Sequence, residues 1–170
     1  MAKFLKVRKP LSFFKWLSIL IVFFTLSLSL FTIILNKKIE ANDTHFKIPL
    51  TNDFGSYRLA GEINNVAVNF ILDSGAEESI LTENLLLKIQ EMTFDNIQYL
   101  PKGSYILADG SEVYCQRINI RSMKIGEHVV MNVVFGIMPA NTDCLLGKNV
   151  LDRYKRWSVN KNLNELTLVR

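Results

Sequence analysis

The sequence predicts a mainly β domain with one or two short helices, preceded by one transmembrane helix. Three observations support this fold class. A stretch of twenty residues near the amino terminus carries no charge. The rest of the chain alternates short apolar runs, rich in β-branched residues, with turn-forming Asn, Asp and Gly. About 130 residues remain outside the apolar region, which suits one compact domain.

The uncharged stretch runs from Trp16 to Leu35. As a helix with a rise of about 1.5 Å per residue, it covers the roughly 30 Å hydrocarbon core of a bilayer. A cleaved secretory signal is the alternative, but its apolar region is usually only about 7 to 15 residues long and ends in a small-x-small site. The following NKKIEAND contains no such site. We therefore expect an uncleaved anchor, and in either case a domain outside the cytoplasm.

Basic residues on the two sides of the span predict its orientation. Five precede the span and two follow it, and the more positive flank is retained in the cytoplasm. The amino terminus is therefore expected inside, and the carboxy-terminal domain on the periplasmic or extracytoplasmic side of the inner (cytoplasmic) membrane. The seven residues are Lys3, Lys6, Arg8, Lys9, Lys15, Lys37 and Lys38.

The expected organisation has four segments: a basic cytoplasmic flank (1–15), a transmembrane helix (16–35), a linker (36–45) and a folded domain (46–170). The chain has a formal net charge of +4, but residues 40–170 hold thirteen basic and sixteen acidic residues. The folded domain thus carries a net charge of −3 and has no concentrated basic face. We expect no nucleic-acid partner.

Four hydroxyl-bearing residues share one face of the expected transmembrane helix. Such a stripe can bring two helices together in a membrane. Alternatively, each hydroxyl donates a hydrogen bond to a carbonyl one turn earlier in its own helix, which needs no partner. We favour the second arrangement. The four residues are Ser18, Thr25, Ser29 and Thr32.

The first strands of the domain form a hairpin that ends at Asp73. YRLAGEI and VAVNFIL have the composition of strands, and they are joined by Asn64 and Asn65, which tolerate the positive φ of a tight turn. A helix of two or three turns, ENLLLKIQ, follows. Thr82 can cap its first turn, where Glu83 also sits favourably.

The remaining segments predict more short strands. SYILADGSEVYC has Asp109 and Gly110 at its centre, and RINIRSMKIGEHVVMNVVFGIM turns around residues 124–127, so both are expected to be hairpins. CLLGKNVLDRY can enter a brief helix after Gly147. WSVNKNLNELTLV has a polar centre that joins two short strands.

The segment that carries most chemical information is FILDSGA, residues 70–76. It delivers an ionisable residue, Asp73, from an apolar strand into a Ser-Gly-Ala turn. A DSG tripeptide alone is common in turns that have no catalytic role. Downstream, however, an Ala-Asp-Gly sequence lies at a hairpin tip (108–110), and a Leu-Leu-Gly sequence precedes a short helix (145–147). Three such elements in this order occur together by chance much more rarely than any one of them occurs alone.

Together these residues resemble the retropepsin-like aspartic peptidases, most closely the bacterial single-domain, membrane-anchored members, over nearly all of residues 46–170. The resemblance implies a closed, β-barrel-like acid-protease (retropepsin) fold with catalytic Asp73 at the bottom of a cleft. It also implies a mobile hairpin that forms a substrate-binding flap, and residues that support the active-site loop. The flap residues would be Ala108, Asp109 and Gly110, and the supporting residues Ser74, Gly75, Ala76, Leu145, Leu146 and Gly147.

Such chemistry needs two carboxylates. Two carboxyl groups pressed together share one proton, so that one acts as base toward a water and the other as acid toward the peptide carbonyl. No metal or other cofactor is required. Asp73 is the only Asp in a D-[ST]-G turn. We therefore expect a homodimer that pairs Asp73 of two copies, with Ser74 hydrogen-bonding across the twofold axis.

The expected function is that of a membrane-anchored aspartic endopeptidase, a hydrolase acting on extracytoplasmic polypeptides. The alternative is a catalytically inactive module that binds peptides or dimerises through the same cleft, since a fold does not guarantee its usual activity. The intact Asp73-Ser74-Gly75 sequence favours the peptidase.

Other candidate residues are expected to be structural. Cys115 and Cys144 lack CxxC spacing and a nearby His, which argues against a zinc site and leaves a disulfide or two buried thiols. Of these two, we favour the thiols. His45 and His128 form no catalytic set, and three acidic residues are expected to be solvated. These are Glu77, Glu78 and Glu83.

Overall fold

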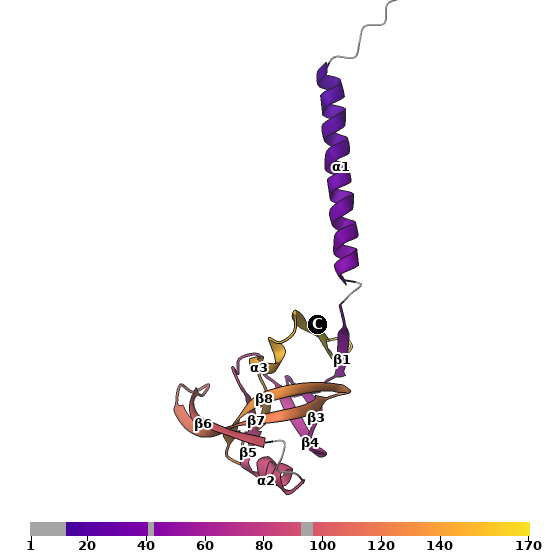
Figure 1. Ribbon diagram of the computed structural model, residues 1–170. Helices are drawn as coiled ribbons and strands as arrows, with labels where there is room; N and C mark the ends of the chain where they lie inside the picture. Colours follow the sequence, from indigo (N-terminus) through magenta and orange to yellow (C-terminus); the bar gives the residue numbers. More distant parts are fainter. Residues whose placement is uncertain (1–12, 41–42, 93–96) are drawn as a thin grey trace, which may run out of the picture. The chain divides into compact units, whose positions relative to one another are not determined.

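The computed structural model describes residues 13–40, 43–92 and 97–170, shown in Figure 1. The chain divides into two units, one ending at Asp43 and the other running from Thr44 to Arg170. Four of the basic residues that predict the orientation of the span lie outside the described residues. They are Lys3, Lys6, Arg8 and Lys9.

The first unit is the helix α1 (Phe13–Glu40), which extends beyond the expected span of residues 16–35 at both ends. Lys37 and Lys38 lie in its last turn, where positive charge interacts favourably with the helix dipole. The segment Lys15–Lys38 is long and apolar enough to cross a membrane, a property that a signal sequence near the amino terminus shares. The structure therefore confirms the expected apolar helix near the amino terminus. That this helix is an uncleaved anchor rather than a cleaved signal sequence stays a prediction.

The hydroxyl groups along α1 bond within their own helix. Ser18 donates to the Lys15 carbonyl at 3.0 Å, and the other three donate in the same way to carbonyls three residues earlier. This is the arrangement favoured from the sequence. The donor–acceptor distances are 2.9 Å for Thr25, 2.8 Å for Ser29 and 2.8 Å for Thr32.

The second unit is built around an eight-stranded sheet in the order β2-β3-β4-β9-β5-β8-β7-β6. An additional pairing of β3 with β7 closes a ring of strands, and the mainly β fold is confirmed (Figure 1). Among the described residues of this unit, two short helices accompany the sheet, α2 (Glu83–Met92) and α3 (Lys148–Leu151). The strands are β2 (Thr51–Asp53), β3 (Ser56–Ile63), β4 (Val66–Leu72), β5 (Ser79–Thr82), β6 (Ile97–Ile106), β7 (Glu112–Ile125), β8 (His128–Met138) and β9 (Cys144–Leu146).

Gly61 permits the ring to close. It pairs with Ile125 where β3 meets β7, and a Cβ at this position would lie 2.9 Å from the Lys124 carbonyl oxygen and 2.7 Å from the Phe70 ring. Neither distance is compatible with a side chain. A glycine is therefore required where these two strands approach each other.

The expected hairpins are present. Asn64 and Asn65 join β3 to β4 with φ angles of 50° and 64°, as the sequence predicts. Thr82 Oγ1 accepts a hydrogen bond from the Leu85 N–H at 3.3 Å and so caps α2. The β2–β3 hairpin was not expected, because the residues of β2 are all exposed and show no apolar alternation.

A smaller sheet has the order β1-β11-β10, from β1 (His45–Pro49), β11 (Glu165–Val169) and β10 (Arg156–Asn160). Beyond β1 and β11, Thr44 N–H donates to the Arg170 carbonyl at 3.2 Å and Arg170 N–H donates to the Thr44 carbonyl at 2.9 Å. The two ends of the unit are thus hydrogen-bonded to each other, and Figure 1 marks the carboxy terminus near β1.

The buried core orients β4 within the ring. Val66, Val68 and Phe70 alternate inward along this strand, and the Phe70 ring stacks on Phe135 of β8 with a centroid distance of 6.1 Å. Because successive side chains of a strand point to opposite faces, this buried alternation fixes the register of β4. The register of β4 in turn fixes where the following residue, Asp73, leaves the sheet.

Candidate active site

Asp73 follows β4 directly and begins a short loop. β4 runs parallel to β9, with Leu72 opposite Leu146, and the Asp73 N–H donates to the Leu146 carbonyl at 3.0 Å. The Asp73 carboxylate accepts a hydrogen bond from the Gly75 N–H at 2.7 Å. Asp73 is half-buried, whereas Ser74 and Gly75 are exposed. The structure thus holds one carboxylate by backbone contacts at a place that solvent reaches.

The Leu-Leu-Gly segment lies against this loop. Lys148 N–H donates to the Ala76 carbonyl at 2.8 Å, and Asn149 N–H donates to the Glu77 carbonyl at 3.0 Å. A Cβ at Gly147 would lie 2.8 Å from the carbonyl oxygens of Ala76 and Glu78. Backbone atoms cannot yield as a flexible side chain can, so only glycine allows this contact. The structure therefore brings the expected loop and the expected supporting residues together.

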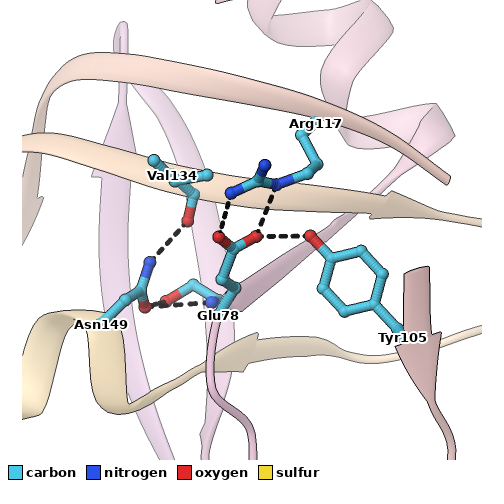
Figure 2. A network of polar contacts seen from close by, with 6 residues as sticks. Glu78, Tyr105, Arg117, Val134 and Asn149 are labelled. Carbon is cyan, nitrogen blue, oxygen red and sulfur yellow. Dashed lines mark hydrogen bonds and ion pairs between the residues drawn. The ribbon is translucent and has the colours of Figure 1, made fainter. Parts of the chain in front are cut away.

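A buried serine closes the far end of the loop. Ser79 is fully buried, and its hydroxyl donates to Asn149 Oδ1 at 2.8 Å and accepts from the Gly147 N–H at 3.0 Å. The Ser79 N–H also donates to Asn149 Oδ1, at 3.0 Å. Asn149 Nδ2 donates to the Val134 carbonyl at 2.7 Å, so the loop is also tied to β8 (Figure 2). These two residues were not identified from the sequence. The only sequence signal for Ser79 was a hydroxyl directly before the apolar pair Ile80-Leu81, and Asn149 had no such signal.

The expected flap residues occupy the exposed tip between β6 and β7. Leu107 N–H donates to the Ser111 carbonyl at 2.8 Å, and Gly110 has a φ of 83°. Asp109 Oδ1 accepts hydrogen bonds from the Ser111 hydroxyl at 2.6 Å and the Ser111 N–H at 2.9 Å, and these bonds lower the pKa of the Asp109 carboxyl. Within the described part of the chain, no hydrogen bond joins this tip to the Asp73 loop.

The Asp73 loop contacts the hairpin away from its tip, through Glu78. Its carboxylate is half-buried and accepts hydrogen bonds from Tyr105 of β6 and Arg117 of β7, as Figure 2 shows. The expectation that Glu78 is solvated was therefore wrong, because its partners lie 27 and 39 residues away in the sequence. Glu77 and Glu83 are exposed, as expected.

The two cysteines are free thiols, so the disulfide alternative is not formed. Cys115 is buried and Cys144 is half-buried, and burial raises the pKa of each thiol. They are therefore poor nucleophiles at neutral pH. Neither thiol offers an alternative to Asp73 as the candidate reactive group.

The chain resembles known proteins in family and in fold. A family model described as "gag-polyprotein putative aspartyl protease" matches residues 59–153, which is more than half of the chain and includes the Asp73 loop, the β6–β7 hairpin and Gly147. No curated protein matches. Among solved structures, the chain is similar to a retropepsin-like aspartic protease from Rickettsia conorii, with a TM-score of 0.51 and 24% sequence identity. This similarity covers 75% of this chain and 91% of that protein, and it shows a shared fold.

Proposed function

Because the chain belongs to this gag-polyprotein aspartyl protease family and is a retropepsin-like aspartic peptidase, we propose that it is an active endopeptidase in which Asp73 is the catalytic carboxylate. The observation that carries the proposal is the hydrogen bond from Gly75 N–H to Asp73, on a loop braced by Gly147. A carboxylate with a fixed position and access to solvent can activate a water molecule.

The second carboxylate is supplied by another copy of the chain. In a twofold dimer, Asp73 of each copy faces the other, and the pair holds one proton because two adjacent carboxylates do not both ionise cheaply. The ionised member removes a proton from water as the water attacks the peptide carbonyl, and the protonated member donates toward the carbonyl oxygen. The two roles then reverse to expel the amine.

The other site residues position this pair and the substrate. Ser74, Gly75 and Ala76 form the loop, which Leu145, Leu146 and Gly147 support from β9. The hairpin tip at residues 108–110 covers an extended peptide, whose backbone can pair with exposed backbone groups of the tip.

The helix α1 anchors the enzyme, with the amino terminus in the cytoplasm and the peptidase domain outside. Its length of 28 residues and its exposed apolar side chains support this role. The excess of basic residues before the span supports the orientation. The substrates are therefore polypeptides outside the cytoplasm.

The substitution Asp73→Asn tests the catalytic role. It keeps the shape of the side chain but removes the ionisable proton, so we expect cleavage of an unfolded protein substrate to fall at least about a hundredfold, with folding intact. Cleavage at acidic to neutral pH, with and without a pepstatin-like inhibitor, is the measurement. The matched control is Asp152→Asn, an exposed aspartate outside the loop. Cleavage by Asp73→Asn at the control rate would refute the proposal.

A further inference from the structure

Glu78 links the Asp73 loop to both arms of the β6–β7 hairpin. Arg117 Nε donates to Oε2 at 2.9 Å, Arg117 Nη2 donates to Oε1, and the Tyr105 hydroxyl donates to Oε2. The guanidinium thus binds the carboxylate through two parallel hydrogen bonds, which fix orientation as well as distance. Glu78 lies five positions after Asp73 in the same loop.

Glu78 contacts the hairpin at the point where β8 stops pairing with β7. β8 pairs with β7 from Arg117 to Ile125, whereas the earlier residues of β7 pair only with β6. Beyond this point the hairpin is largely exposed, with Ile106 80% and Tyr114 71% exposed. The register of β6 also shifts between Leu100 and Gly103. A register shift of this kind bends a strand locally, so Glu78 binds the hairpin at its bend.

Two glycines make room for the side chains that reach Glu78. A Cβ at Gly136 would lie 2.9 Å from Cζ and from the hydroxyl oxygen of Tyr105. A Cβ at Gly103 would lie 2.6 Å from Cδ of Arg117. Both distances are shorter than van der Waals contact. The neighbouring strands therefore carry glycine at the two positions where a side chain would push the ring or the guanidinium away.

The cluster stays charged although it is partly buried. Burial opposes ionisation of Glu78, but the hydrogen bonds from Arg117 and Tyr105 and the charge of Arg117 outweigh it and lower the pKa of this carboxyl. Burial and the neighbouring carboxylate raise the pKa of Tyr105, so its hydroxyl remains a donor. The three hydrogen bonds are charge-assisted, and such bonds are stronger than neutral ones.

We propose that Glu78, Tyr105 and Arg117 are positioning residues, which hold the β6–β7 hairpin at a fixed place relative to the Asp73 loop during cleavage. This inference rests on the proposed function of Asp73 and of the hairpin tip. Without the cluster, the peptide under the hairpin is held out of line with Asp73. Because a displacement of about 1 Å can lower a rate a hundredfold, the loss falls on the catalytic step.

The test compares Glu78→Gln with wild type in the full-length chain solubilised in detergent. We expect kcat per active site, counted by titration with a tight pepstatin-like inhibitor, to fall about tenfold with KM within about threefold. A residue that only stabilised the fold would lower the number of titratable sites and leave kcat per site unchanged. The control is Glu127→Gln, in the exposed β7–β8 turn, with unchanged kcat expected. Unchanged kcat per site for Glu78→Gln would overturn the inference.

Tyr105→Phe provides a milder variant, because it keeps the ring in the space above Gly136 and removes only the hydroxyl. We expect a smaller fall in kcat, and no further fall when it is combined with Glu78→Gln, since both act through one cluster. Additive effects of the two substitutions would overturn the inference. The comparison of these two single variants with the double variant tests the inference even if every substitution of Arg117 prevents folding.

Hydrogen exchange gives a readout that does not depend on activity. We expect the amides of residues 104–115 to exchange faster in Glu78→Gln than in wild type or in Glu127→Gln. Unchanged exchange in this segment would overturn the inference. If wild type shows no cleavage that depends on Asp73, the proposed function fails by itself, and exchange still decides whether the cluster holds the hairpin.

Discussion

Asp73 is held by backbone groups rather than by other charged side chains. The Leu146 carbonyl accepts a hydrogen bond from the Asp73 N–H, and the Gly75 N–H donates to the Asp73 carboxylate. The Ser79 hydroxyl, at the end of the same loop, accepts from the Gly147 N–H. The Ser79 hydroxyl satisfies the N–H of Gly147 and one lone pair of Asn149 Oδ1. The buried hydrogen bonds of Ser79 therefore restrict the movement of the loop that carries Asp73.

Replacing Ser79 by Ala should destabilise the domain. The change leaves the buried Gly147 N–H without its acceptor, which costs about 1–3 kcal/mol. Urea unfolding followed by fluorescence of Trp157, which packs against the core, measures the loss. Ser158→Ala, an exposed serine of β10, should change the free energy of unfolding by less than about 0.5 kcal/mol. Equal stability of the two variants would show that the Ser79 hydrogen bonds contribute nothing.

Residues in short motifs could be predicted from the sequence, and residues in distant contacts could not. Asp73 and Gly147 stand in recognisable sequences at a strand end and before a helix. Glu78, in contrast, follows Glu77 in a run that reads as solvated. Only the folded sheet brings Arg117, 39 residues away, to its carboxylate.

At the scale of elements, the hairpins were predictable because each depends on a local turn. Asn64 and Asn65 adopt the positive φ that their residue type allows. The parallel pairings of β4 with β9 and of β5 with β8 have no such local signal, since they join segments far apart in the chain. These pairings create the site, because β9 supplies the carbonyl that binds Asp73.

Gly110 at the tip of the β6–β7 hairpin offers a test of the proposed flap. Its φ of 83° disfavours any side chain, although no atom lies within 4 Å of a Cβ placed there. We expect Gly110→Ala to raise KM several-fold and to cost about 1–2 kcal/mol of stability. Steady-state cleavage and urea unfolding are the measurements.

Gly126→Ala is the matched control for the tip. Gly126 also has a positive φ, 55°, but it lies in the β7–β8 turn, where a Cβ would make only ordinary contacts with Ile48 at 3.7 Å. The control should lose similar stability and keep the wild-type KM. If both variants show the same KM, the tip of the β6–β7 hairpin does not bind substrate.

At the scale of the whole molecule, the proposed site is complete only in a pair of chains. Asp73→Asn subunits mixed in threefold excess with wild type, at constant total concentration and with free exchange, should reduce activity to about one sixteenth. The reason is that both members of a productive pair must be wild type. Activity of about one quarter, in proportion to the wild-type fraction, would show that each chain has a complete site of its own.

The proposed orientation in the membrane is tested by a reporter fused after Arg170. An enzyme that is active only outside the cytoplasm should be active in this fusion, because the basic flank keeps the amino terminus inside. The same fusion placed before Lys3 should be inactive. Activity of a cytoplasm-specific reporter after Arg170 would reverse the orientation.

The hydrogen bonds between Thr44 and Arg170 make the path of the domain almost circular. A short linker could join these two residues without disturbing either sheet, because the ends already lie within hydrogen-bonding distance. New ends could then be cut in the exposed turn of residues 161–164. Such a permuted chain would begin with β11 and continue directly into β1, its neighbour in the sheet. The long-range pairing of β1 with β11 would become a local hairpin, and the pairing of β10 with β11 would instead join the last strand to the first.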